Sequence, residues 1–255
     1  MFLKHIIMIK KGAYVLFVLT ILLIWGCSEN PEEETKSCQN LIGKTKIMPL
    51  GASRVQGARP YFESFRYELW KILLTDDWKV DFVGTQEDNT TYEVYKNYCF
   101  DNDHEGRGGW TSSQINNQIE NWLNQSESPD VVLFSSPGGN DALQGIAIEE
   151  ILPNINAIID KIQAHNPNAT ILIEQMAPGK SSFMTTELLT AFDQMKLKIA
   201  EISLAKTTST SKVIIVDMAT GFTDNFLADN VHYNTAGAAF IAKRYYEKLL
   251  PFLKK

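Results

Sequence analysis

Several features that would assign this chain of 255 residues to a common class of protein are missing. Its 24 lysines and arginines, against 30 aspartates and glutamates, form no basic stretch, so nucleic acid is not an expected partner. None of the three cysteines lies at a metal-ligand spacing, which argues against a zinc site. No internal repeat and no second domain can be traced. One core of roughly 200 residues is therefore expected.

The chain also lacks an apolar run long enough for a permanent transmembrane helix. Lys4, Lys10 and Lys11 precede an apolar stretch from Ala13 to Trp25. This stretch of about 13 residues falls short of the roughly 20 that span a bilayer, and it is typical of a cleaved secretion signal. We therefore predict a signal peptide over residues 1–26.

The residues that end the apolar stretch, Ile24-Trp25-Gly26-Cys27, resemble a bacterial lipobox. The resemblance implies a lipidated Cys27 at the mature N-terminus, and a plain signal peptide with an incidental cysteine is the alternative. The polar, acidic residues that follow predict a solvated tether over residues 27–44. They resemble the export tag of surface-exposed lipoproteins, although any polar linker has this composition. We expect a secreted bacterial protein lipid-anchored to the outer membrane, at its periplasmic or cell-surface face, with no other membrane contact.

Two cysteines remain once Cys27 is assigned to lipid. Cys38 and Cys99 are an even number in an oxidising compartment, which permits one disulfide between the start of the domain and a long loop. Two free buried thiols are the alternative, because the sequence does not show whether the two residues approach each other.

Short apolar runs alternate with amphipathic stretches over residues 45–255, which we interpret as one domain. The alternation predicts a three-layer α/β/α sandwich with a central parallel sheet. A polar segment without periodicity, residues 88–103, is long enough to be a functional loop. The expected strands are 47–50, 80–83, 131–134, 170–173 and 213–216, and the expected helices are 61–74, one from residue 111, 149–163, 185–204 and 236–252.

Unusual clusters of residues follow three of the expected strands. In such a sheet the ligand site lies beyond the carboxyl ends of the strands, where these clusters would meet. Gly51-Ala52-Ser53 follows the first strand, Ser136-Pro137-Gly138-Gly139-Asn140-Asp141 the third, and Asp229-Asn230-Val231-His232 the last. A glycine-rich segment, 106–109, is the fourth candidate.

The scarcity of histidine, with four in the chain, narrows the search for a catalytic base. A serine hydroxyl is a poor nucleophile until a base removes its proton, and a carboxylate commonly orients that base. His5 belongs to the signal peptide, and His165 lies in a turn on the far side of a strand. His104 offers a less obvious relay than His232, which has Asp229 three residues earlier. We interpret His232 as the base.

Taken together, the clusters resemble the four sequence blocks of the SGNH (GDSL-like) hydrolases in order and spacing. The resemblance covers the chain from about Lys46 to its end and implies a flavodoxin-like fold. Residues 46–51 and 103–111 look most like the acetylxylan-esterase branch, carbohydrate esterase family three. That branch removes acetyl groups from sugars.

The resemblance also implies a role for each site residue. Ser53 would be the nucleophile and, through its backbone amide, the first oxyanion donor. The second donor would be the Gly109 backbone amide and the third the Asn140 side chain, each worth about 3 kcal/mol when aimed at the charged oxygen. His232 would be the base and Asp229 its orienting partner, with no metal or organic cofactor. The expected activity is a serine esterase that cleaves short acyl esters, acetyl esters of carbohydrate above all, through an acyl-enzyme.

Three positions depart from the family pattern. Ala52 stands where aspartate is usual, Gly139 where threonine is usual and Tyr233 where proline is usual, which indicates a subfamily with its own substrate. A lipase or thioesterase for longer acyl chains is one alternative, since the triad does not choose the acyl chain. A surface glycan-binding lipoprotein with a decayed site is another, favoured by Ala52 alone.

Five further residues lie near the motifs. Arg54, Arg59 and Arg107 either contact a substrate or serve the structure, as arginines near loops more often do. Trp110 and Tyr92 are candidates for stacking on a sugar. For Trp110 core packing is favoured, because it opens an amphipathic helix.

Overall fold

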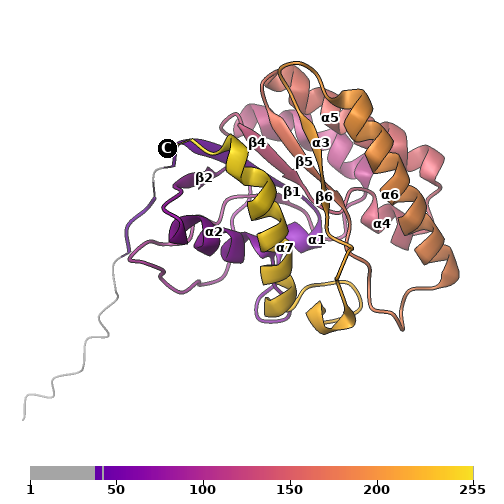
Figure 1. Ribbon diagram of the computed structural model, residues 1–255, viewed down its shortest axis with the longest axis horizontal. Helices are drawn as coiled ribbons and strands as arrows, with labels where there is room; N and C mark the ends of the chain where they lie inside the picture. The colour runs from indigo at the N-terminus through magenta and orange to yellow at the C-terminus, as the bar shows by residue number, and fades with distance from the viewer. Residues whose placement is uncertain (1–37, 42, 255) are drawn as a thin grey trace, which may run out of the picture. The chain divides into compact units, whose positions relative to one another are not determined.

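A parallel sheet forms the centre of the computed structural model, which describes residues 38–41 and 43–254. The short β3 (Glu105–Gly106) pairs with the end of β1. All strand pairs of the sheet are parallel, as predicted. The other strands lie side by side in the order β2 (Val80–Phe82), β1 (Thr45–Gly51), β4 (Val131–Phe134), β5 (Thr170–Gln175) and β6 (Val213–Asp217) (Figure 1).

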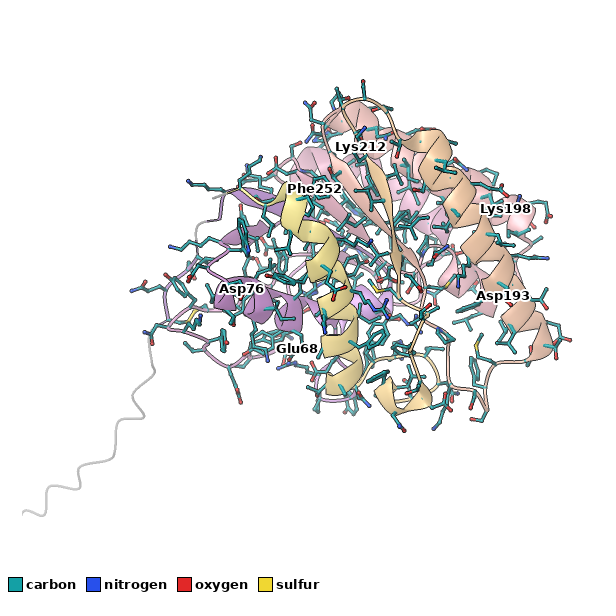
Figure 2. The ribbon with its side chains drawn as sticks, in the orientation of Figure 1. Glu68, Asp76, Asp193, Lys198, Lys212 and Phe252 are labelled. Carbon is teal, nitrogen blue, oxygen red and sulfur yellow. A yellow bond between two sulfur atoms is a disulfide. The ribbon has the colours of Figure 1, made fainter. Side chains whose placement is uncertain are left out.

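Helices cover both faces of this sheet, which confirms the three-layer α/β/α fold. On one face lie α2 (Phe65–Thr75) and α7 (Thr235–Leu249), which pack against each other (Figure 1). On the other lie α3 (Ser112–Gln125), α5 (Ile148–His165) and α6 (Thr186–Lys206). The outer side of α6 carries charged side chains such as Asp193 and Lys198 (Figure 2).

Most residues in the middle of the long strands are apolar because both faces of the sheet are covered. Successive side chains of a strand point to opposite faces. On β1, Ile47 packs in the core that contains α2 and α7, and Met48 packs in the core that contains α3 and α5. All four residues of β4 are buried for the same reason. The carboxyl ends of the strands are therefore held rigidly at one edge.

Side-chain caps decide where several helices begin. The Ser64 side chain accepts a hydrogen bond from the Arg66 amide, so α2 begins at Phe65 and the predicted start at residue 61 is wrong. Residues 58–62 instead close a tight turn. At Thr111 a capping box with Gln114 starts α3, as predicted.

The sequence pattern did not predict five of the short elements. These are β3, two helices of one turn that carry site residues, and two 3₁₀ turns, the second of which replaces the predicted end of the last helix. Elements this short have no measurable periodicity. The short helices are α1 (Ser53–Gln56) and α4 (Gly139–Leu143), and the 3₁₀ turns are η1 (Asp224–Phe226) and η2 (Leu250–Phe252).

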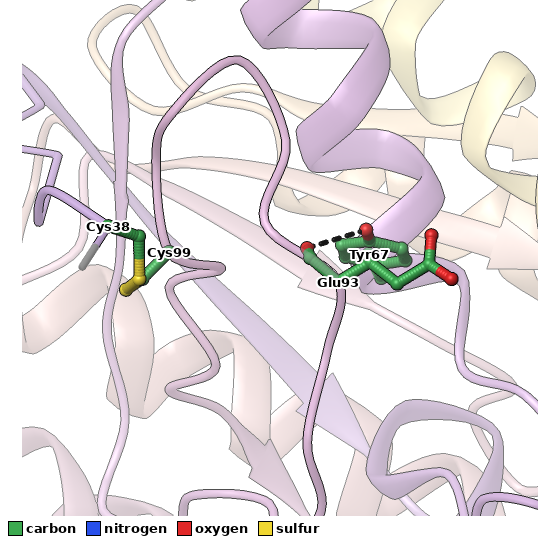
Figure 3. The surroundings of a disulfide bond; sticks show 4 residues. All are labelled: Cys38, Tyr67, Glu93 and Cys99. Carbon is green, nitrogen blue, oxygen red and sulfur yellow. Dashed lines mark hydrogen bonds between the residues drawn. A yellow bond between two sulfur atoms is a disulfide. The ribbon is translucent and has the colours of Figure 1, made fainter. Parts of the chain in front are cut away.

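Several contacts fasten the long loop, residues 88–103, to the body of the domain, among them a disulfide and a hydrogen bond from α2. A disulfide joins Cys38 to Cys99, with Cα atoms 5.1 Å apart (Figure 3). Farther along, the Tyr67 hydroxyl of α2 donates to the Glu93 carbonyl oxygen at 2.9 Å (Figure 3). Residues 38–41, assigned to the tether from the sequence, contact this loop through two backbone hydrogen bonds of Gln39.

The predicted signal peptide, 1–26, the lipidation site Cys27 and most of the acidic tether lie outside the described residues. None of the helices in the described part of the chain is long and apolar enough to cross a membrane.

Candidate active site

Three chain segments meet at the carboxyl edge of the sheet. Ser53 begins α1 directly after β1, Asn140 lies in α4 after β4, and Asp229 and His232 lie in the loop between β6 and α7. The strand order reverses between β1 and β4, since the chain passes from β1 to β2 and then crosses back. A reversal of this kind opens a crevice in parallel sheets.

Ser53, His232 and Asp229 form a continuous hydrogen-bonded relay. The Ser53 Oγ lies 2.8 Å from His232 Nε2, and His232 Nδ1 lies 2.7 Å from Asp229 Oδ2. A carboxylate only accepts hydrogen bonds, so Nδ1 carries the proton of the neutral ring and the Nε2 lone pair faces the serine hydroxyl. This tautomer is the one that can remove a proton from Ser53.

The local sequence fixes the orientation of the His232 ring. Asp229 Oδ1 accepts hydrogen bonds from the backbone amides of Val231, at 2.8 Å, and His232, at 2.7 Å. Phe62 stacks on the imidazole with ring centroids 3.9 Å apart and planes 13° apart. The carboxylate holds one edge of the ring and Phe62 covers one face. The Phe62 contact had no signal in the sequence.

Burial alone would raise the pKa of Asp229. The hydrogen bonds from the His232 ring and from the two backbone amides outweigh that effect, and the pKa is held below its usual value. Asp229 is therefore a carboxylate over the whole neutral range and can stabilise a positive charge on His232.

Of the two further candidate oxyanion donors, Asn140 lines the same cavity as Ser53, and Gly109 follows Gly108, which lies close to the Ser53 side chain. Gly109 adopts a left-handed φ of 79°, in a turn closed by the hydrogen bond from the Trp110 amide to the Arg107 carbonyl oxygen. Asn140 Nδ2 donates to the Trp110 carbonyl oxygen at 2.8 Å, which uses one of its two hydrogens. The Gly109 turn thus positions the Asn140 amide, whose second hydrogen remains for a ligand.

A small pocket of about 40 Å³ opens beside Ser53. Most of its surface is apolar. Side chains from α4, from the segment after β5 and from α6 form its walls. Its lining residues are Ala52, Ser53, Arg54, Ser136, Gly139, Asn140, Leu143, Met176, Phe192 and Val231. We call this cavity the small pocket.

The geometry agrees with comparisons to known proteins. The model of the GDSL-like lipase/acylhydrolase family matches residues 74–240, well over half of the chain. The chain belongs to this family. The matched segment contains Gly109, Asn140, Asp229 and His232 and begins after Ser53, which the fold brings to His232. No curated protein matches the chain.

Solved structures of esterases resemble this GDSL-like hydrolase over most of its length. An acetyl esterase mutant with acetate ion has a TM-score of 0.71 and 27% identity, covering 82% of this chain and 97% of its own. A carbohydrate esterase family 3 protein from Talaromyces cellulolyticus has a TM-score of 0.69 and 28% identity, with coverage of 82% and 97%. A family 3 carbohydrate esterase from Clostridium thermocellum has a TM-score of 0.66 and 29% identity, with coverage of 84% and 96%. The chain is a carboxylic ester hydrolase.

Arg54 of the GDSL-like hydrolase serves the structure of the site. Its guanidinium group donates to the carbonyl oxygens of Val231 and Ala177, each at 2.8 Å, and lies 4.8 Å from the centre of the Tyr233 ring. It is 8% exposed. Arg54 therefore joins the nucleophile helix to the loop that carries His232.

The turn before Asn140 is strained and held by a buried acid. Ser136 has a φ of 46°, which is unusual for a residue other than glycine. Its amide donates to Glu174 Oε2 at 2.7 Å, and its hydroxyl lies 3.2 Å from the same oxygen. Burial raises the pKa of Glu174. The sequence hinted at this contact only through an acidic residue at the end of an apolar strand.

The other arginines and aromatic residues singled out in the sequence also contact other side chains of this GDSL-like hydrolase. Arg59 pairs with Glu63, and Arg107 pairs with Glu105. Trp110 packs against Trp122, with ring centroids 5.5 Å apart, as favoured from the sequence. The Tyr92 hydroxyl donates to Asp88, and its ring packs on Arg59, Tyr67 and Phe100.

A second histidine–aspartate pair lies in the interior. His104 Nε2 is 3.2 Å from Asp88 Oδ1, and His104 Nδ1 accepts a hydrogen bond from the Gly106 amide at 2.9 Å. Arg66 donates to both Asp88 oxygens at 2.7 Å and also to the carbonyl oxygens of α1 at Val55 and Gln56. The pair thus supports the helix that begins with Ser53.

Within the part of the chain that the structure describes, no group of three or more histidine, cysteine or acidic side chains is arranged to hold a metal ion.

Proposed function

We propose that this hydrolase removes short acyl groups, acetyl above all, from carbohydrate through an acyl-enzyme. The observation that carries the proposal is the relay from Asp229 through His232 to Ser53 Oγ, beside the small pocket. Ala52, the departure that favoured a decayed site, leaves each contact of this relay in place.

The relay supports two successive acyl transfers. Ser53 Oγ attacks the carbonyl carbon while His232 Nε2 takes its proton, and the protonated ring then gives that proton to the leaving alcohol oxygen as the ester bond breaks. Water next attacks the acyl-enzyme while His232 takes one of its protons. The ring returns this proton to Ser53 Oγ as the acid departs.

In each tetrahedral intermediate the negative oxygen would be stabilised by the Ser53 and Gly109 amides and by Asn140 Nδ2. These donors are fixed before the reaction, so little reorganisation is needed when the charge develops. The side chain of Ala52 makes no capping hydrogen bond at the start of α1, and so does not compete for the amides there.

The size of the small pocket favours a short acyl group. A cavity of roughly 10–15 Å³ is needed to hold one water molecule. At about 40 Å³ the pocket has room for about three water-sized groups. An acetyl group matches that size, and its methyl matches the apolar walls.

The surroundings of His232 favour a carbohydrate as the leaving alcohol. The leaving oxygen must lie near His232 Nε2, next to the turn that carries Phe62 and Tyr61. Tyr61 is 83% exposed and offers a free aromatic face. Nearby, a cleft of about 200 Å³ between the end of α1 and the long loop is lined by polar side chains such as Gln86, Asn89 and Thr90. The carbohydrate esterase names of two similar structures support the same substrate class.

The proposal includes a lipid anchor at Cys27, which would hold the enzyme at the outer membrane. The lipobox-like sequence before Cys27 supports it. Metabolic labelling with a fatty acid should tag the wild-type chain and leave a Cys27→Ser chain untagged. Labelling of both chains, or of neither, would count against the anchor.

Acetate release from acetylated xylan and other acetylated glycans tests the function. We expect release by the full chain and none by the Ser53→Ala chain at equal concentration. A chain that cleaves synthetic acetate esters but no glycan would retain the mechanism and lose the carbohydrate substrate. Turnover that persists in Ser53→Ala would overturn the mechanism.

A matched pair of variants tests the sugar side of the site. Tyr61→Ala should raise KM for acetylated glycan several-fold and leave cleavage of a small aryl acetate unchanged, because Tyr61 is 83% exposed and takes no part in the hydrogen bonds of the Ser53–His232–Asp229 relay. Tyr61→Trp keeps an aromatic face and should behave like the wild type. Equal effects on both substrates would argue against sugar contact.

A further inference from the structure

A second, larger cavity adjoins the small pocket. It is a groove of about 500 Å³ between α6 and the connection from α4 to α5, and we call it the apolar groove. Ile146, Ile148, Leu188 and Met195 supply apolar walls, and Glu149 and Glu187 also line it. Leu143 lines both the groove and the small pocket.

The attack geometry decides which part of an ester enters the small pocket. The carbonyl oxygen must face the oxyanion donors, and the leaving oxygen must face His232 Nε2. The remaining substituent of the carbonyl carbon is the acyl chain. The acyl chain must therefore point toward Leu143, Met176 and Phe192, which are the apolar walls of the small pocket.

Leu143 ends the short helix α4, and α6 lies opposite. Phe192 of α6 faces the small pocket, whereas Leu188, Ala191 and Met195, within one turn of it, face the groove. The two cavities therefore follow the same pair of helices. The Leu143 side chain stands where they meet.

We propose that Leu143 sets the upper limit of acyl-chain length by separating the small pocket from the apolar groove. This inference rests on the proposed function, since it takes the acyl group of the Ser53 intermediate to occupy the small pocket. A smaller side chain at residue 143 would join the two cavities and let the methylene groups of a longer chain enter the groove. One methylene in a hydrophobic pocket changes kcat/KM by roughly 10–200-fold, so the change should be large.

Hydrolysis of 4-nitrophenyl acetate, butyrate, hexanoate and octanoate by the full chain tests the inference. In the wild type kcat/KM should fall steeply as the acyl chain grows beyond acetate. In Leu143→Ala the kcat/KM for hexanoate should rise, and its ratio to the kcat/KM for acetate should rise at least tenfold. Leu143→Val should shift the limit by less, and it still tests the inference if the alanine variant misfolds.

Leu189→Ala is the matched control, because Leu189 lies on α6 beside the groove, is 48% exposed and lines neither cavity. It should leave the chain-length profile unchanged. An unchanged profile in folded Leu143→Ala and Leu143→Val, or equal wild-type rates for octanoate and acetate, would overturn the role of Leu143 and leave the esterase proposal standing. If the wild type cleaves none of the esters and Ser53 fails to react with a fluorophosphonate, the proposed function falls and this inference falls with it.

Discussion

His232–Asp229 and His104–Asp88 pair the same residue types in two very different settings. At the edge of the sheet the His232 side chain is 19% exposed and that of Asp229 is 51% exposed, whereas in the interior the His104 side chain is 2% exposed and that of Asp88 is 7% exposed. His232 has its Nε2 lone pair directed at a hydroxyl. Both ring nitrogens of His104 are occupied by fixed partners.

The two rings also carry their protons on opposite nitrogens. The Gly106 amide donates to His104 Nδ1, so the proton of the neutral ring lies on Nε2 and points at Asp88. Burial lowers the pKa of His104 to about 4, so this ring is neutral at pH 7. A histidine–aspartate pair is therefore no sign of catalysis by itself. The decisive feature is the ring nitrogen opposite the carboxylate and the group that it faces.

The largest effect should follow from substituting the exposed histidine. His232→Ala removes the base, and kcat for a short ester should fall by roughly 10⁴-fold or more. The melting temperature should hardly change, because the side chain is not part of the core. Steady-state kinetics and thermal unfolding of one preparation check both. A large loss of stability in His232→Ala would contradict the distinction between a catalytic and a structural histidine.

Changing the aspartate of each pair to asparagine tests whether that pair serves catalysis or stability. Asp229→Asn should lower kcat by roughly 10²–10⁴-fold, because the His232 tautomer is no longer fixed, at little cost in stability. Asp88→Asn should lower the free energy of unfolding by about 3–5 kcal/mol, since it leaves the buried Arg66 charge without its partner. Denaturant titrations and kcat of both chains provide the test. Similar behaviour of the two variants would contradict the distinction.

His104→Ala should act on stability rather than on chemistry. The loss of packing and of two buried hydrogen bonds should cost about 2–4 kcal/mol. The fraction that stays folded should keep most of its activity, because His104 touches no reacting atom. Activity measured per folded molecule at low temperature checks this, with His232→Ala as the opposite control. A folded but inactive His104→Ala would assign the buried pair a chemical role.

The smallest effect is the pH dependence of the His104 contribution. Its folded pKa of about 4 lies below the usual value near 6.5, so its contribution to stability is complete above about pH 6.5 and is lost as the pH falls toward 4. The difference in melting temperature between the wild type and His104→Ala should therefore shrink from pH 7 to pH 4. A difference that stays constant over this range would show that the ring titrates normally.

The sequence predicted most of the fold because the long helices carry periodic patterns and the buried strands are short apolar runs. The apolar run Val131–Phe134 became β4 with the same bounds, and the capping box at Thr111 marked the start of α3. The short elements β3, α1 and α4 carry neither a helical period nor a continuous apolar run. They follow from the close approach of segments distant in sequence.

The residues of the candidate site likewise differ in whether the sequence could predict them. Ser53, Asp229 and His232 could be proposed because histidine is scarce in the chain and all three residues lie in motifs that follow strand ends. Arg54 and Arg66 gave no such signal, since their partners are mostly backbone carbonyl groups of remote segments. A carbonyl group is present in every residue, so no sequence pattern marks it as a partner. The supporting contacts of the site were therefore found only in the folded chain.

The Cys38–Cys99 bond shortens the reach of the enzyme from the proposed lipid at Cys27. The 11 residues from Ser28 to Cys38 can extend at most roughly 36–40 Å. Reduction would remove this covalent limit, although the backbone hydrogen bonds of Gln39 and the buried Leu41 would still hold the segment before β1. In the proposed lipoprotein, the bond that fastens the long loop thus also limits how far from the bilayer the domain can lie.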